Sequence, residues 1–170
     1  HVGLFICIDQ EGGRVTRLFE NKGFTEFPSA MAIGATSKPE NAGRIARAIA
    51  VEMKALGLNV NFAPVLDVNN NAINPIIGTR SFSSDPNIVA KFGVAFLKGL
   101  QSEGILAFGK HFPGHGDTGT DSHIALPVIR AQIPEVRDLW LPPAACSYRI
   151  AVVSIDKRYP GQARRVMLAL

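Results

Sequence analysis

Short apolar runs alternate along the chain with longer segments in which apolar residues recur at helical spacing. The apolar runs at residues 3–8, 60–66 and 105–109 are rich in Leu, Ile, Val and Phe, which predicts three buried strands. Polar residues or glycines follow each run at once. The segment between the first strand and residue 37 is predicted to be a long loop.

Two helices are predicted between these strands. Ser37-Lys-Pro-Glu40 offers an N-cap, an early proline and an acid in the first turn, and apolar residues at helical spacing continue up to Gly57. Asp85 and Pro86 begin a second amphipathic segment, which ends at Gly104.

The order strand, helix, strand, helix, strand is typical of right-handed βαβ units on a parallel sheet. Asp9, Asp67 and the pair Lys110-His111 lie just past the ends of the predicted strands, at the edge where (β/α)-barrels and open α/β sheets build their sites. A complete barrel needs about 250 residues. The 170 residues, with three to four βα units, therefore predict an α/β protein that forms part of a (β/α)8 TIM barrel.

The sequence patterns that predict helices and strands become weaker after residue 130. Prolines interrupt the helix that should follow, and one β-like run at 150–155 precedes a basic end without periodicity. We therefore divide the chain into residues 1–130, part of the barrel, and residues 131–170, a divergent tail of the kind that a mistranslated or misjoined gene would give.

Composition and charge narrow the function classes. With 46% hydrophobic and 19% charged residues, the chain is an ordinary globular protein. Residues 141–170 hold five basic residues and one acidic residue, which equals the whole net charge of +4. A nucleic-acid partner, which would need a clustered basic face, is not expected. No apolar run reaches the roughly 18 residues of a membrane span, and the natural N-terminus is expected to lie before His1.

The densest group of ionisable residues follows the third predicted strand. Residues 110–123, KHFPGHGDTGTDSH, hold three histidines, two aspartates and a lysine. Proline and glycine exclude a regular helix there, so these groups lie on a loop at a strand end, where functional residues are common. One interpretation is that they only tie down a glycine-rich turn, but six ionisable groups are more than such a turn needs.

Two chemical interpretations of this loop compete with that structural one. A metal site would draw on the loop's histidines and aspartates, namely His111, His115, Asp117, Asp121 and His123. It is disfavoured because proline and glycine keep the first two histidines off a common helical face, and because a lysine precedes the first ligand. General acid/base catalysis would instead use Asp121 and His123, since a carboxylate two positions before a histidine can accept its ring N–H and support the imidazolium.

Four segments together resemble glycoside hydrolase family 3, and within it the bacterial β-N-acetylglucosaminidases. The segments are DQEGGRVTR at 9–17, NFAPVLDV at 61–68, IGTRSF at 77–82 and the loop at 110–123. The resemblance covers roughly residues 3–130. The K-H-F-P-G-H-G…D-S-H run is highly specific, because the β-glucosidases of the same family lack the D-S-H dyad and use a distant carboxylate as acid/base.

This resemblance implies a barrel enzyme that removes terminal, non-reducing β-linked N-acetylglucosamine from cell-wall, muropeptide-type or related glycosides by a retaining mechanism. His123 matches the family's acid/base histidine, and Asp121 matches its partner. The positions that grip the terminal sugar match Asp9, Arg17, Arg80, Lys110 and His111. Supporting roles are expected for Glu11, Arg14, Asp67 and His115. The implied partner is a saccharide, and no cofactor or metal is implied.

The family's nucleophile has no match in this chain. It is an aspartate on a later strand in a pattern like S/T-D-A/D, and the aspartates after Asp121, Asp138 and Asp156, have other surroundings. Three interpretations follow: a hydrolase of which this chain alone is inactive, a phosphorylase of the same family, or a catalytically dead sugar-binding remnant. The segment from Asn69 to Arg80 looks more like exported members than cytoplasmic ones. The aglycone and the oligomeric state are left open.

Overall fold

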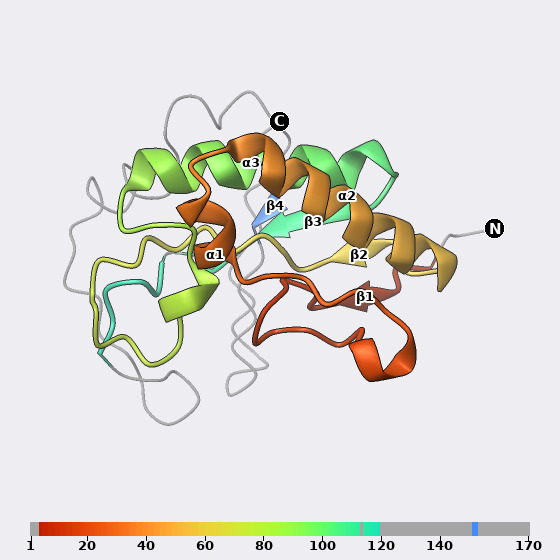
Figure 1. The fold of residues 1–170 in the computed structure, drawn as a ribbon, viewed down its shortest axis with the longest axis horizontal. Coiled ribbons are helices and arrows are strands. Elements are labelled where there is room, and N and C mark those ends of the chain that lie inside the picture. The colour runs from red at the N-terminus through yellow and green to blue at the C-terminus, as the bar shows by residue number, and fades with distance from the viewer. Residues whose placement is uncertain (1–3, 113, 120–150, 153–170) are drawn as a thin grey trace.

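The computed structural model describes residues 4–112, 114–119 and 151–152 (Figure 1). Its strands are β1 (Cys7–Ile8), β2 (Val60–Asn61), β3 (Leu106–Gly109) and β4 (Ala151–Val152). Its α-helices are α1 (Ala30–Ala35), α2 (Pro39–Ala55) and α3 (Pro86–Ser102), and its 3-10 helices are η1 (Glu20–Lys22) and η2 (Gly78–Arg80).

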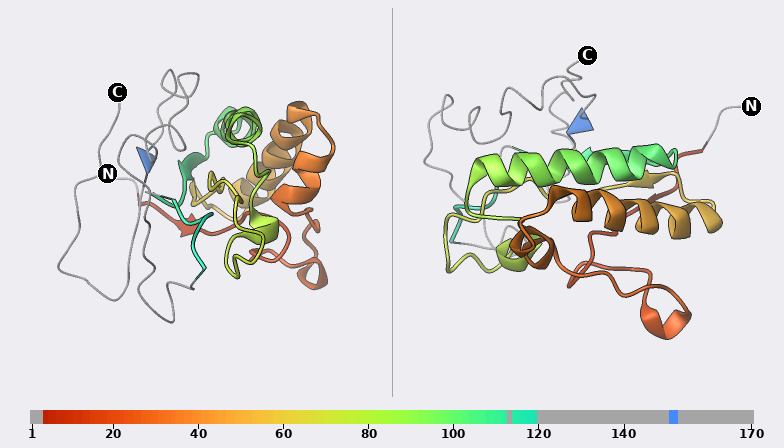
Figure 2. Two further views of the ribbon diagram at one scale, coloured as in Figure 1. Left: turned by 90° about the vertical axis from the view of Figure 1, so that its left-hand side faces the viewer. Right: turned by 45° about the horizontal axis from the view of Figure 1, so that its top comes forward.

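All four strands are parallel and lie in the order β1-β2-β3-β4. Helix α2 connects β1 to β2, and α3 connects β2 to β3, so the chain forms consecutive βαβ units. The two helices lie side by side over one face of the sheet (Figures 1 and 2). The predicted α/β class is confirmed.

Strand β4 lies within the β-like run predicted at 150–155. It pairs with β3 in parallel, with Phe108 opposite Ala151 and Gly109 opposite Val152. The predicted domain boundary at residue 130 falls among residues outside the described part of the chain, so that division stays a prediction.

The regular strands are shorter than the apolar runs that predicted them. Beyond β2, Pro64 has no N–H to contribute to the ladder, and the backbone continues along β3 with less regular bonds. The Lys110 N–H donates to the Pro64 carbonyl oxygen (3.1 Å), and the Leu66 N–H donates to the Lys110 carbonyl oxygen (2.6 Å). These bonds hold the segment that leads to Asp67 against the end of β3.

Asparagine side chains extend the pairing of β1 with β2 in both directions. Asn59 Oδ1 accepts from the Ile6 N–H (2.8 Å), and Asn61 Oδ1 accepts from the Gln10 N–H (3.0 Å). Asn61 Nδ2 also donates to the Gln10 carbonyl oxygen (2.9 Å). The backbone just after β1 is thereby fixed to β2 by a buried amide.

The helix starts follow the predicted capping chemistry at α3 and depart from it at α2. The Asp85 carboxylate caps α3 by accepting from the Asn87 N–H (2.8 Å). The N-cap of α2 is Lys38 rather than the expected Ser37, because Pro39 occupies the first helical position and the N-cap is then the residue directly before it. Ser37 instead has a left-handed backbone, with φ 55°.

The long segment predicted as a loop contains α1 and η1. Helix α1 has only six residues, too few for hydrophobic periodicity to reveal, and Ser29 caps it through a bond from the Ala32 N–H (3.4 Å). It packs closely on the segment after η2, since a Cβ at Gly34 would lie 2.0 Å from the Phe82 carbonyl oxygen.

The core lies between the helices and the sheet. Helices α2 and α3 approach closely, because a Cβ on Gly99 would lie 2.3 Å from the Gly43 carbonyl oxygen. The large, fully buried side chains of these two helices are Ile49, Met53, Phe96 and Leu100. Among the described residues, no helix is both long and apolar enough to cross a membrane.

Candidate active site

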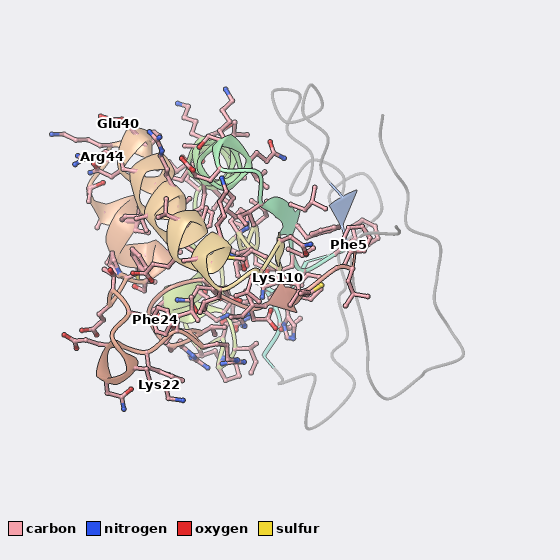
Figure 3. All side chains as sticks on the ribbon, turned by 90° about the vertical axis from the view of Figure 1, so that its right-hand side faces the viewer. Phe5, Lys22, Phe24, Glu40, Arg44 and Lys110 are labelled. Carbon is pink, nitrogen blue, oxygen red and sulfur yellow. The ribbon has the colours of Figure 1, made fainter. Side chains whose placement is uncertain are left out.

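Polar residues that follow different strands converge at one edge of the sheet. Asp9 follows β1, and Lys110 follows β3. Lys110 Nζ lies 2.6 Å from Asp9 Oδ1 and 2.5 Å from Glu11 Oε1. Figure 3 shows Lys110 toward the middle of the molecule, while Lys22, Glu40 and Arg44 lie at its periphery. This lysine is thus held between two carboxylates on a different segment of the chain.

Glu11 also binds Arg80, which lies at the end of η2. Arg80 Nε donates to Glu11 Oε2 (2.9 Å), and Arg80 Nη2 donates to Glu11 Oε1 (2.9 Å). The exposed fractions of the side chains are 6% for Glu11, 10% for Lys110 and 11% for Arg80. Two parallel bonds of this kind fix orientation as well as distance. One buried carboxylate therefore sets the positions of two cations.

Burial and charge act in opposite directions on this group. Burial alone would raise the pKa of Glu11, but the hydrogen bond from Arg80 and the charges of Lys110 and Arg80 together hold that pKa below its ordinary value. Burial would lower the pKa of Arg80, but its hydrogen bonds to Glu11 and the nearby carboxylate charges raise it. The pair is therefore ionised at neutral pH.

Asp67 organises the other side of the same cluster. Its side chain is 0% exposed. Oδ2 accepts from the backbone N–H of His111 (3.1 Å) and lies 2.6 Å from Nδ1 of the same residue. Its Oδ1 accepts from the backbone N–H of His115 (2.5 Å). The Ser81 hydroxyl donates to the carbonyl oxygen of Asp67 (2.6 Å). Asp67 thus joins the loop after β3 to the segment that carries Arg80.

His111 completes the connection between these two carboxylates. Its Nε2 lies 3.2 Å from Nη2 of Arg80, while its Nδ1 contacts Asp67. A continuous chain of polar contacts therefore runs from Asp9 through Lys110, Glu11, Arg80 and His111 to Asp67. Four of the five predicted sugar-binding residues, Asp9, Arg80, Lys110 and His111, belong to it.

Arg17, the fifth predicted sugar-binding residue, is placed differently. Its side chain is exposed and donates to the Thr16 carbonyl oxygen (3.1 Å). Within the described part of the chain it has no ion pair with the cluster. Its predicted role stays a prediction.

The predicted catalytic pair, Asp121 and His123, lies outside the described residues, so its role also stays a prediction. The described loop residues before it are well anchored. A Cβ at Gly116 would lie 1.7 Å from the Val68 carbonyl oxygen, and Asn74 Nδ2 donates to the His115 carbonyl oxygen (2.6 Å). Among the described residues, no group of three or more His, Cys, Asp or Glu side chains is arranged to hold a metal ion.

Gln10 is a positioning residue that sequence reasoning missed. It is fully buried, and its Oε1 accepts from the backbone N–H groups of Arg17 (2.7 Å) and Leu18 (3.2 Å). Together with its backbone bonds to Asn61, this side chain closes the turn that carries Glu11. A polar residue between two acids directly after a buried strand was the signal available in the sequence.

The family was tested by comparison with known proteins. The protein-family model described as the glycosyl hydrolase family 3 N terminal domain matches residues 1–152 of this chain. The chain belongs to glycosyl hydrolase family 3. The resemblance noted in the sequence is thereby confirmed.

Individual relatives of this family 3 chain agree. It is 51% identical over 129 residues to Beta-hexosaminidase A of Pseudoalteromonas piscicida, an alignment that covers 74% of this chain and 21% of the relative. It superposes with a TM-score of 0.84 and 46% identity on a family 3 β-N-acetylglucosaminidase from Paenibacillus sp. str. FPU-7, covering 91% of this chain and 30% of that one.

A ligand-bound structure is also similar. NagZ from Neisseria gonorrhoeae, in complex with N-trifluoroacetyl-D-glucosamine, gives a TM-score of 0.79 and 37% identity, and the alignment covers 90% of this chain and 46% of NagZ. The family 3 chain therefore spans less than half the length of each of these three proteins. The predicted partial barrel is confirmed by these superpositions.

Proposed function

We propose that the protein containing this chain is a retaining β-N-acetylglucosaminidase that removes terminal, non-reducing β-linked N-acetylglucosamine from cell-wall, muropeptide-type or related glycosides. Relatives named as β-hexosaminidases and β-N-acetylglucosaminidases support the activity. The complex of NagZ with an N-acetylglucosamine analogue supports the sugar. The observation that carries the proposal is the shared Glu11 carboxylate, which leaves Lys110 and Arg80 with a small, defined set of free donors.

The free donors can be counted. Lys110 has three N–H groups, and two donate to Asp9 and Glu11. Arg80 has five N–H groups; two contact Glu11, one contacts His111 and one reaches the Ile76 carbonyl oxygen at 3.3 Å. Among the described residues, one N–H of each cation therefore remains for a ligand.

An acceptor lies beside these donors. Asp9 is 43% exposed and uses only Oδ1 to pair with Lys110 in the described part of the chain. A sugar hydroxyl both donates and accepts, so neighbouring hydroxyls of one ring can bond to Asp9 Oδ2 and to the remaining N–H groups. Such a site selects hydroxyl positions rather than charge.

The net charge of the cluster favours a neutral ligand. Lys110 and Arg80 carry two formal positive charges, and Asp9, Glu11 and Asp67 carry three negative ones, a sum of −1. Because both cations are already paired with carboxylates, the described cluster offers no unpaired positive charge to an anion such as phosphate. This balance favours hydrolysis over phosphorolysis within the family.

The chemistry would be carried by residues that follow the described loop. His123, supported by Asp121, would protonate the leaving oxygen while a carboxylate nucleophile attacks the anomeric carbon. It would then take a proton from the water that releases the sugar. The nucleophile would come from a segment without a match in this chain, which is why residues 1–170 alone are expected to be inactive. The resemblance of the loop from Asn69 to Arg80 to exported relatives favours an exported enzyme.

Product analysis tests this proposal. The complete gene product that carries this sequence should release N-acetylglucosamine from a muropeptide-type disaccharide, with retention at the anomeric centre and at the same rate with or without phosphate. N-acetylglucosamine 1-phosphate as the main product would establish a phosphorylase instead. Binding of N-acetylglucosamine without any turnover would establish a sugar-binding remnant.

A further inference from the structure

The ring of His111 lies between an obligatory acceptor and an obligatory donor. Asp67 Oδ2 lies 2.6 Å from Nδ1 of His111, and Arg80 Nη2 lies 3.2 Å from Nε2. An ionised carboxylate can only accept a hydrogen bond, and a guanidinium can only donate one. One arrangement of the ring satisfies both contacts: Nδ1 carries the hydrogen, and Nε2 presents its lone pair.

Of Asp67, His111 and Arg80, Asp67 is the residue that the surrounding structure holds most firmly. It is fully buried, and its two oxygens accept three N–H groups from two residues of the loop, His111 and His115. Arg80 is held in place separately by Glu11. His111 is the more accessible partner, with 32% of its side chain exposed. The buried carboxylate therefore orients the ring whose edge reaches the site.

We propose that Asp67 is a positioning residue that fixes His111 in the Nδ1–H tautomer, so that Nε2 acts as a hydrogen-bond acceptor for the sugar. This inference rests on the proposed function for the identity of the ligand. The contact of Nε2 with Arg80 is longer than the 2.9 Å bonds between Arg80 and Glu11. A sugar hydroxyl that donates to Nε2 would replace this weaker contact and leave the Arg80–Glu11 pair intact.

Replacement of Asp67 by Asn would disturb this arrangement through its hydrogen bonding, because the two side chains have nearly the same shape. An amide group has one acceptor oxygen and one donor nitrogen. If the amide nitrogen faces His111 Nδ1, the ring must move its hydrogen to Nε2, where it meets the guanidinium N–H. If it faces His115, it meets that residue's backbone N–H. Neither orientation preserves both contacts.

The first test reads the tautomer of His111 directly in the wild-type protein. Two-bond 1H–15N spectra of the complete gene product, labelled with 15N-histidine, should show His111 with a protonated Nδ1 and an unprotonated Nε2, the signal being assigned with His111→Asn. Asp67→Asn should lose this pattern. Asp85→Asn, the same change at the exposed N-cap of α3, should keep it. A proton on Nε2 in the wild-type protein would overturn the proposal, whether or not the protein hydrolyses glycosides.

The second test is a double-mutant cycle with N-acetylglucosamine as the probe, read as a dissociation constant. Loss of a hydrogen bond to a correctly oriented group corresponds to about 10- to 100-fold in affinity, and Asp67→Asn should weaken binding by that amount. In a His111→Ala background the same change should cost less than about threefold, because the effect passes through the ring. Equal losses in both backgrounds would show that Asp67 only supports the fold, and would overturn the assignment.

Discussion

The Glu11→Gln variant tests how strongly the site depends on one buried carboxylate. The substitution keeps the size of the side chain and removes its charge. Glu11 is 6% exposed and holds Lys110 at 2.5 Å and Arg80 through two bonds of 2.9 Å. In the variant, these two cations stay buried with one counter-charge fewer.

The expected loss of stability follows from this geometry. Removal of one partner from a buried ion pair costs about 3–5 kcal/mol, because the remaining charge is left uncompensated. Lys110 keeps its bond to Asp9, and the amide oxygen of the substituted side chain would still accept one bond from Arg80. We therefore expect a loss of about 3 kcal/mol in the free energy of unfolding, at the lower end of that range.

Urea denaturation at pH 7, followed by circular dichroism, measures this loss. Glu103→Gln is the matched control, because Glu103 also lies near two cations, Arg47 (2.7 Å) and Lys54 (3.9 Å), which are 68% and 63% exposed. Ion pairs with exposed partners contribute about 0–1 kcal/mol, so the control should lose less than that. If Glu11→Gln were as stable as Glu103→Gln, the carboxylate would not hold the site together.

Further predictions concern pH and the loops around the site. Because the pKa of folded Glu11 lies below its ordinary value of 4.5, its stabilisation is fully present above about pH 4.5 and is lost as the pH falls through the folded pKa. Below about pH 4.5, the urea midpoint of Glu11→Gln should therefore fall less steeply with pH than that of the wild-type protein, and equal slopes would contradict this. Gly116→Ala should lower the melting temperature, since its Cβ would lie 1.7 Å from the Val68 carbonyl oxygen. Gly119→Ala should not, because no heavy atom of the described residues would lie within 4 Å of its Cβ; similar melting temperatures would refute the close contact at Gly116. Arg17→Ala should raise KM for an aryl N-acetylglucosaminide without changing the melting temperature, because within the described part of the chain its exposed side chain bonds only a neighbouring backbone oxygen. An unchanged KM would remove Arg17 from the site.

The sequence predicted those parts of the fold that depend on local patterns, such as helix capping and the apolar runs of strands. Helix α3 begins at Asp85 as its capping chemistry indicated, and the strand ends that carry Asp9 and Lys110 meet as expected for a parallel sheet. Helix α1 was missed because six residues are too few to show a period. The N-cap of α2 was displaced by one residue because the position of Pro39 decides it.

The connections inside the site could not be predicted from spacing. Glu11 and Asp67 were expected only to support the sugar-binding residues, and no local pattern showed that one would join Arg80 to Lys110 and the other His111 to His115. These contacts join residues from different strands, so they depend on the register of the sheet. A family resemblance names the residues at a site, and the structure shows which of them hold the others in place.

The most direct test of the proposed function measures the role of His123 in the complete gene product. His123→Ala and Asp121→Asn would be assayed on aryl N-acetylglucosaminides whose leaving groups differ in pKa. General acid catalysis typically contributes about 10²- to 10⁴-fold, so the loss should be of that size for poor leaving groups and much smaller for activated ones, which depart without a proton. A loss that is the same for every leaving group, or wild-type activity that a chelator abolishes, would contradict the acid/base role of His123 and support a metal site.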